Sequence, residues 1–153
     1  MQGKAARVLT IGLVAGMAGG IAEVAWISLY AAVTASDAAV VARGVTETLR
    51  ITSSAPVLAG MAIHMAIAAM LGIALVAALA PLRLEGARLY AILAGVLACV
   101  WAINFMIVLP LINPAFVEIV PLGASFTSKL LFGIAAAASL QFAQRAKPVF
   151  AQR

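Results

Sequence analysis

The sequence predicts an all-α integral membrane protein that folds as a four-helix transmembrane bundle, and three observations lead to this fold class. Hydrophobic residues make up 65% of the 153 residues and charged residues only 10%, against about 45–50% and 25% in soluble domains. Four apolar runs reach the length of about 20 residues that a helix needs to cross the hydrocarbon core. These runs are rich in alanine, leucine and glycine without a period of two, which favours helices over a membrane β-barrel.

The four predicted spans follow one another within a single domain, residues 1–153. The first run is too long to be a signal peptide and carries Glu23 in its middle, so we expect a retained helix rather than a cleaved leader. Proline, glycine and charged residues interrupt the apolar pattern between the runs. The predicted spans cover about residues 8–33, 56–80, 89–112 and 124–143.

Two of the connecting segments have their own patterns. In the first, Ser36 or Asp37 can cap a short helix, and the apolar residues that follow at helical spacing predict an amphipathic helix at the membrane interface. This stripe comprises Ala38, Val41, Val45 and Leu49. Two prolines in residues 113–121 predict a compact turn or a partly re-entrant cap, and the serines and threonine of ASFTSK are expected to cap the fourth span.

The basic residues predict how the protein lies in the membrane. Lys and Arg accumulate in cytoplasmic loops, and seven of them fall on one side of the predicted spans, with only Glu85 opposing them: Lys4, Arg7, Arg83, Arg88, Arg145, Lys147 and Arg153. The other side carries Arg43 and Arg50 together with three acidic residues. We therefore expect both termini in the cytoplasm, with the protein in a bacterial-type inner (plasma) membrane.

Each predicted span contributes one strongly polar residue to the outer half of the bilayer: Glu23, His64, Asn104 and Lys129. At 1.5 Å per residue, their depths are about 15, 12, 12 and 8 Å. Small residues share the faces of three of them, which is typical of helix–helix contacts. We expect an inward-facing polar pocket that binds a ligand or relays protons, with walls from Trp26, Met61, Met65 and Trp101. The alternative is a buried network that only fixes helix register.

The residue types of this pocket limit its chemistry. Met61, His64 and Met65 share a face and are soft ligands that suit Cu(I), but the chain has no second histidine, which disfavours both copper and haem sites. A quinone or another lipid-soluble molecule fits better, because His64, Asn104 and Lys129 can donate to it. The single cysteine, Cys99, is interpreted as a small apolar residue.

Three functions remain open from the sequence. The favoured hypothesis is a binding or accessory subunit of a larger membrane complex, with a polar pocket for a lipid-soluble ligand, an ion or a partner. The alternative is a small oligomeric, proton-coupled carrier that uses Glu23 and His64, and the third is a purely structural membrane protein. The sequence lacks the usual catalytic motifs, so no enzyme is predicted. The expected partners are the lipid bilayer and other membrane subunits or further copies of the chain, and not nucleic acid.

Overall fold

The computed structural model describes residues 2–82 and 84–146, and within these ranges it contains helices and no strand. The helices are α1 (Gln2–Thr34), α2 (Ala39–Thr48), α3 (Pro56–Leu79), η1 (Ala80–Leu82), α4 (Gly86–Ile103), η2 (Asn104–Val108), α5 (Leu109–Ile112), α6 (Pro114–Ile119) and α7 (Leu122–Ala146). Four stretches of the described chain are long and apolar enough to cross a membrane: Gly3–Thr34, Pro56–Leu82, Gly86–Ile112 and Leu122–Arg145. These stretches match the four predicted spans, and their length and composition are those of a multi-pass membrane protein.

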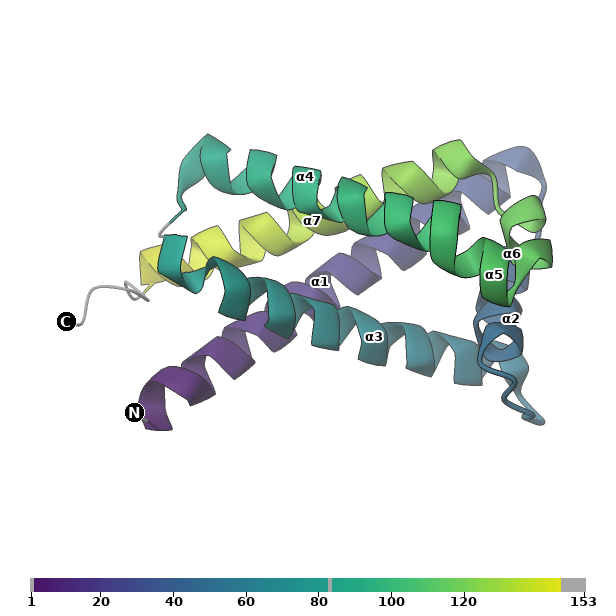
Figure 1. The fold of residues 1–153 in the computed structure, drawn as a ribbon, viewed down its shortest axis with the longest axis horizontal. Coiled ribbons are helices and arrows are strands. Elements are labelled where there is room, and N and C mark those ends of the chain that lie inside the picture. The colour runs from purple at the N-terminus through teal and green to yellow at the C-terminus, as the bar shows by residue number, and fades with distance from the viewer. Residues whose placement is uncertain (1, 83, 147–153) are drawn as a thin grey trace.

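Helix α1 is central to the bundle because it packs against both α3 and α7 (Figure 1). Its contact with α3 is close enough that a Cβ atom on Gly16 would overlap the backbone of Ala68 and Ala69. Likewise, a Cβ on Gly72 of α3 would overlap the α1 backbone. Glycine at these positions lets two helices approach without side chains between them, so that the α1–α3 pair is fixed in position.

Helix α7 joins α4 to the rest of the bundle. The ring of Phe132 is fully buried and lies against Gly19 of α1. On the other side of α7, Gly133 faces the backbone of Leu93 in α4. The main apolar core is formed where these helices meet, around Ala15, Ala68, Leu75, Val76, Leu89, Leu93, Leu97, Phe132, Ala136, Ala137 and Leu140.

One end of the bundle is closed by α2 and α6, and we call it the capped end (Figure 1). The start of α1 and the end of α7 lie at the opposite end. Helix α2 forms where a short helix was predicted, and the side chain of Asp37 accepts a hydrogen bond from the Ala39 N–H at 2.8 Å. A Cβ on Gly60 of α3 would overlap the Ala42 carbonyl, so α2 lies directly on the end of α3.

Residues 113–121 contain a short helix, α6, and not only the turn that the two prolines suggested. Asn113 caps this helix, because its side-chain oxygen accepts from the Phe116 N–H at 3.2 Å. Pro114 is compatible with the first helical position, where no N–H partner is needed. The Asn113 amide also donates to Thr48 Oγ1 at 2.9 Å, which connects α6 to α2.

The third span is continuous but changes its winding near the capped end. Residues Asn104–Val108 form a π-helical turn, in which the Leu109 N–H donates to the Asn104 carbonyl. Pro110 follows directly and has no N–H, and its ring would clash with the carbonyl four residues earlier in a regular helix. The wider π turn therefore lies where a proline would otherwise break the helix.

Candidate binding cavity

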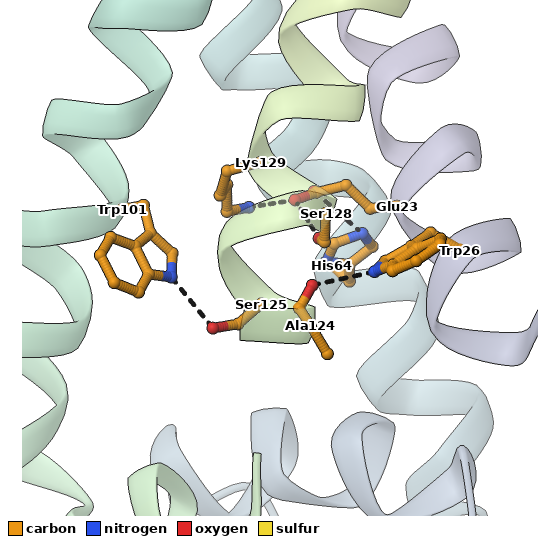
Figure 2. A network of polar contacts seen from close by, with 8 residues as sticks. All are labelled: Glu23, Trp26, His64, Trp101, Ala124, Ser125, Ser128 and Lys129. Carbon is orange, nitrogen blue, oxygen red and sulfur yellow. Dashed lines mark hydrogen bonds and ion pairs between the residues drawn. The ribbon is translucent and has the colours of Figure 1, made fainter. Parts of the chain in front are cut away.

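The Glu23 carboxylate is the centre of a buried polar cluster that joins α1, α3 and α7 (Figure 2). Its side chain is only 4% exposed. The Oε1 atom lies 2.5 Å from Nζ of Lys129 and accepts a hydrogen bond from Ser128 Oγ at 2.9 Å. The Oε2 atom lies 3.6 Å from Nε2 of His64. Two helices, α3 and α7, thus direct polar side chains to one carboxylate of α1.

Lys129 balances the charge of Glu23 within the span. A lone charge near the middle of a bilayer costs about 2.5–3.5 kcal/mol on insertion scales, and pairing reduces that cost. The Lys129 ammonium group also lies 5.8 Å from the centre of the Phe132 ring, within reach of a cation–π interaction. Both contacts hold Lys129 toward the bundle interior.

His64 is close to Glu23 but is not hydrogen-bonded to it. The 3.6 Å separation between Nε2 and Oε2 exceeds the usual hydrogen-bond range of about 2.7–3.2 Å. The Nε2 atom is buried, and among the described residues it has no hydrogen-bond partner. Native proteins leave few buried polar atoms unpaired, so this nitrogen is an exception within the cluster.

Asn104 lies on the wall of the same cavity, but it does not contact the Glu23 cluster. Within the described part of the chain, no hydrogen bond of its side chain is found. Asn104 begins the π turn of the third span, and α4 packs mainly on α7. Of the four predicted polar residues, three therefore meet and the fourth lines the cavity beside them.

Two serines of α7 belong to this site and were not predicted to do so. Ser128 donates to Glu23, and Ser125 accepts from the Trp101 indole N–H at 3.0 Å while donating to the Leu122 carbonyl at 2.9 Å (Figure 2). We expected these serines to cap the helix, but α7 begins earlier, at Leu122. The sequence does contain a signal for this role. Ser125 and Ser128 are three residues apart and Phe132 follows four residues later, so all three share the face of α7 that is buried in the bundle.

A cavity of about 710 Å³ extends from the polar cluster to the capped end. Its walls are mainly apolar and come from α1, α2, α3, the third span, α6 and α7. The polar side chains that reach it are Glu23, Ser28, Thr48, His64, Asn104, Ser125, Ser128 and Lys129. This combination of apolar walls and a few convergent polar groups is typical of small-molecule sites.

Of the four predicted wall residues, only Met61 lines the cavity. The Met65 side chain packs against Gly20 of α1 instead. The Trp26 indole donates to the Ala124 carbonyl at 2.9 Å (Figure 2), and Trp101 stacks on Phe105. These three side chains make helix-to-helix contacts, and the aromatic walls are formed by Phe105 and Phe116.

Exposed side chains of α3 and of the third span contribute to the cavity lining. Ile67 of α3 lines the cavity and is 48% exposed, while Ile103 and Val108 line the opposite wall and are 55% and 38% exposed. All three lie within membrane-spanning stretches. Apolar surface at the level of the spans therefore borders the cavity.

The cluster can bind polar groups through hydrogen bonds and through one balanced ion pair. Among the described residues, no group of three or more His, Cys, Asp or Glu side chains could hold a metal ion. Comparison of the chain with protein-family models, with curated proteins and with solved structures finds no match.

Proposed function

We propose that this protein binds a lipid-soluble ligand in the cavity and acts as an accessory subunit of a larger membrane complex. The observation that carries the proposal is the Glu23–Lys129–His64 cluster on the wall of an otherwise apolar cavity. The volume of about 710 Å³ falls within the range of about 300–1,000 Å³ that is common for small-molecule sites. The His64 and Lys129 side chains line the cavity and are 28% and 20% exposed, so they offer the ligand polar contacts.

We infer that a ligand enters through a lateral opening between α3 and the third span. Its rim carries aliphatic side chains from two membrane-spanning helices. A molecule dissolved in the bilayer reaches this opening without passing through water, whereas a water-soluble molecule would have to cross apolar surface. We infer that the ligand is mainly apolar and enters from the lipid.

The charge distribution supports an orientation with the capped end outside the cell. Of the basic residues used for that prediction, Lys4, Arg7, Arg88 and Arg145 belong to the ends of helices opposite the capped end, whereas Arg83, Lys147 and Arg153 lie outside the described residues. Both termini are then cytoplasmic, in a bacterial-type inner membrane. In this orientation, the cavity lies in the outer half of the bilayer.

A cavity-filling substitution tests the binding function. Val100 lines the cavity on α4, and Val100→Trp places a large ring in it. Ile92→Trp is the control, since Ile92 is on the same helix, is exposed and does not line the cavity. Each protein is purified from its own membrane in mild detergent, and bound lipids are extracted and identified by mass spectrometry.

We expect one lipid-soluble species at close to one molecule per chain in the wild type and in Ile92→Trp, and its loss in Val100→Trp. If all three proteins retain the same lipids, the cavity is not a binding site and the proposal is wrong.

The accessory role is tested in the same preparations. Larger membrane proteins should co-purify at a fixed ratio, and a chain that elutes alone contradicts this role.

A further inference from the structure

We propose that the ligand has an uncharged head group with a carbonyl oxygen, and that this oxygen accepts a hydrogen bond from the Lys129 ammonium group while Lys129 stays paired with Glu23. The inference rests on the proposed binding function and specifies the class of ligand. Three features of the cavity carry it: which part of the polar cluster a ligand can reach, the charge balance, and the hydrogen-bond donors that remain unused.

Lys129 is the charged side chain through which a ligand can reach the cluster. Glu23 and Ser128 are buried and hydrogen-bonded to each other. The His64 ring is partly exposed, but it has a hydrogen bond with the Gly20 backbone, and its Nε2 atom is buried. The Lys129 side chain lines the cavity and remains partly exposed. A ligand in the cavity therefore meets the cluster at this lysine.

The charge balance disfavours an ionic head group. Among the residues that line the cavity, the side chains with a fixed charge are Glu23 and Lys129, and they already form an ion pair. A carboxylate or phosphate at Lys129 would compete with Glu23 for it, and an ammonium group would compete with Lys129 for Glu23. Either exchange leaves one buried charge without a partner. An uncharged head group leaves the ion pair intact.

The unused donors of Lys129 determine what the head group must offer. An ammonium group has three N–H donors and no acceptor. In the part of the chain that the structure describes, Oε1 of Glu23 takes one donor and the Phe132 ring faces the same group. At least one donor is therefore left for a ligand. A carbonyl oxygen satisfies it, because this oxygen has two lone pairs and brings no hydrogen of its own.

Other uncharged oxygen groups match this donor less well. A hydroxyl group can accept from Lys129, but its hydrogen then needs an acceptor, and the neighbouring Glu23 carboxylate is buried. An ether oxygen has no such hydrogen but carries less negative charge than a carbonyl oxygen. A hydrogen bond from a charged donor is a strong class of hydrogen bond, so the better acceptor gains more from it. The site therefore favours a carbonyl compound over the corresponding ether or alcohol.

The rest of the ligand must match apolar walls. Ile27, Val45 and Leu71 are among the aliphatic side chains that line the cavity, and a hydrocarbon or isoprenoid chain fits this surface. Asn104 also lines the cavity, and its amide can bind a second polar group of the ligand. Two sources share this chemistry, a fatty acid ester and a quinone with a hydrocarbon tail.

A series of probes with one chain and different head groups tests the inference. Methyl oleate, oleyl methyl ether, oleyl alcohol, oleic acid and oleylamine are each added to delipidated protein in mild detergent, and one-to-one complexes are quantified by native mass spectrometry. Methyl oleate and oleyl methyl ether differ only in the carbonyl oxygen. We expect the ester to bind about tenfold more tightly than the ether or the alcohol, the effect of one hydrogen bond to a charged group.

Two variants test whether Lys129 causes this preference. Glu23→Leu/Lys129→Met removes the donor together with its counter-ion, so that no unpaired charge remains, and it should bind ester and ether equally. Ser28→Ala removes an exposed hydroxyl group from the cavity lining and should keep the preference. A folded double variant that still prefers the ester tenfold would contradict the role of Lys129. The wild-type comparison of ester with ether stands even if the double variant does not fold.

The outcomes separate this inference from the proposed function. Equal binding of ester and ether, abolished for both by Val100→Trp, would retain the cavity as a binding site and overturn the carbonyl inference. Tightest binding of the acid, the amine or the alcohol would overturn it as well. If the binding of no probe depends on residue 100, the proposed function itself fails.

A second pair of probes distinguishes the two sources. A decyl-substituted benzoquinone has two carbonyl oxygens, and its reduced benzohydroquinone has two hydroxyl groups instead. Tighter binding of the quinone than of both the hydroquinone and methyl oleate supports a quinone ligand. Tighter binding of methyl oleate than of the quinone supports a fatty acid ester. Tighter binding of the hydroquinone than of the quinone contradicts the inference.

Discussion

Removing Lys129 should destabilise the protein more than removing any exposed basic residue. In Lys129→Met the side chain keeps most of its length, but the Glu23 carboxylate, 4% exposed, loses its ion-pair partner at 2.5 Å. Breaking a buried ion pair from one side costs about 3–5 kcal/mol. Lys129 is itself 20% exposed, so we expect the lower end, about 3 kcal/mol. For a chain of this size, that corresponds to a fall in Tm of about 6–12 °C.

The assay is thermal unfolding in detergent, followed by near-ultraviolet circular dichroism. The decisive variant is the double substitution Glu23→Gln/Lys129→Met, which removes both charges and retains a side-chain oxygen for Ser128. It should recover at least half of the decrease in Tm caused by Lys129→Met, because no unpaired charge remains. Arg43→Met is the matched control, since Arg43 forms its ion pair with Asp37 at an exposed position, and its Tm should be nearly unchanged. A double variant that is less stable than Lys129→Met would refute the reasoning.

Three further predictions concern the rest of the fold. Gly16→Ala should lower the unfolding free energy by about 1–3 kcal/mol through overlap with the α3 backbone, whereas Gly95→Ala, which points into open space, should not lower it in the same denaturation assay. A hydrogen bond from Arg43 lowers the pKa of Asp37 from 3.8. The contribution of this hydrogen bond to stability is therefore present above about pH 4 and is lost as the pH falls through the lower pKa of Asp37 in the folded state. In Arg43→Gln, an NMR titration should give a higher pKa for Asp37, and an unchanged pKa contradicts this prediction. Finally, the native cysteine is replaced by alanine and Ser53→Cys is introduced. The new cysteine should react with a membrane-impermeant maleimide in intact cells. Labelling only after lysis would show that the orientation is opposite to the proposed one.

The spans could be predicted from the sequence because hydropathy over about 20 residues depends on the membrane rather than on tertiary contacts. A related physical reason supported the prediction that Glu23 and Lys129 share one pocket. Two opposite charges inside an apolar layer have few ways to avoid a large desolvation cost except by pairing. The structure shows them in contact, with His64 beside them.

The role of each wall residue could not be predicted in this way. Whether Trp26 or Trp101 faces a cavity depends on helix rotation and on rotamers, and both indoles donate hydrogen bonds to α7 instead. Asn104 lines the same cavity as the other three predicted polar residues, but a predicted depth does not determine which helices touch. Ser125 and Ser128 were assigned to a helix end because a boundary predicted from sequence is uncertain by a few residues, and the observed start at Leu122 puts them inside α7.

The π turn at Asn104–Val108 also affects how this span tolerates insertions and deletions. In a regular α-helix, each residue turns the chain by about 100°, so a one-residue deletion rotates every later side chain onto a different face. A π turn holds one residue more than the equivalent α turn. Shortening the span by one residue at this turn would keep Leu97 and Leu109 on their faces, but regular winding would then bring the Pro110 ring against the carbonyl four residues earlier. A deletion of the same size elsewhere in the span would misalign one of these two buried contacts.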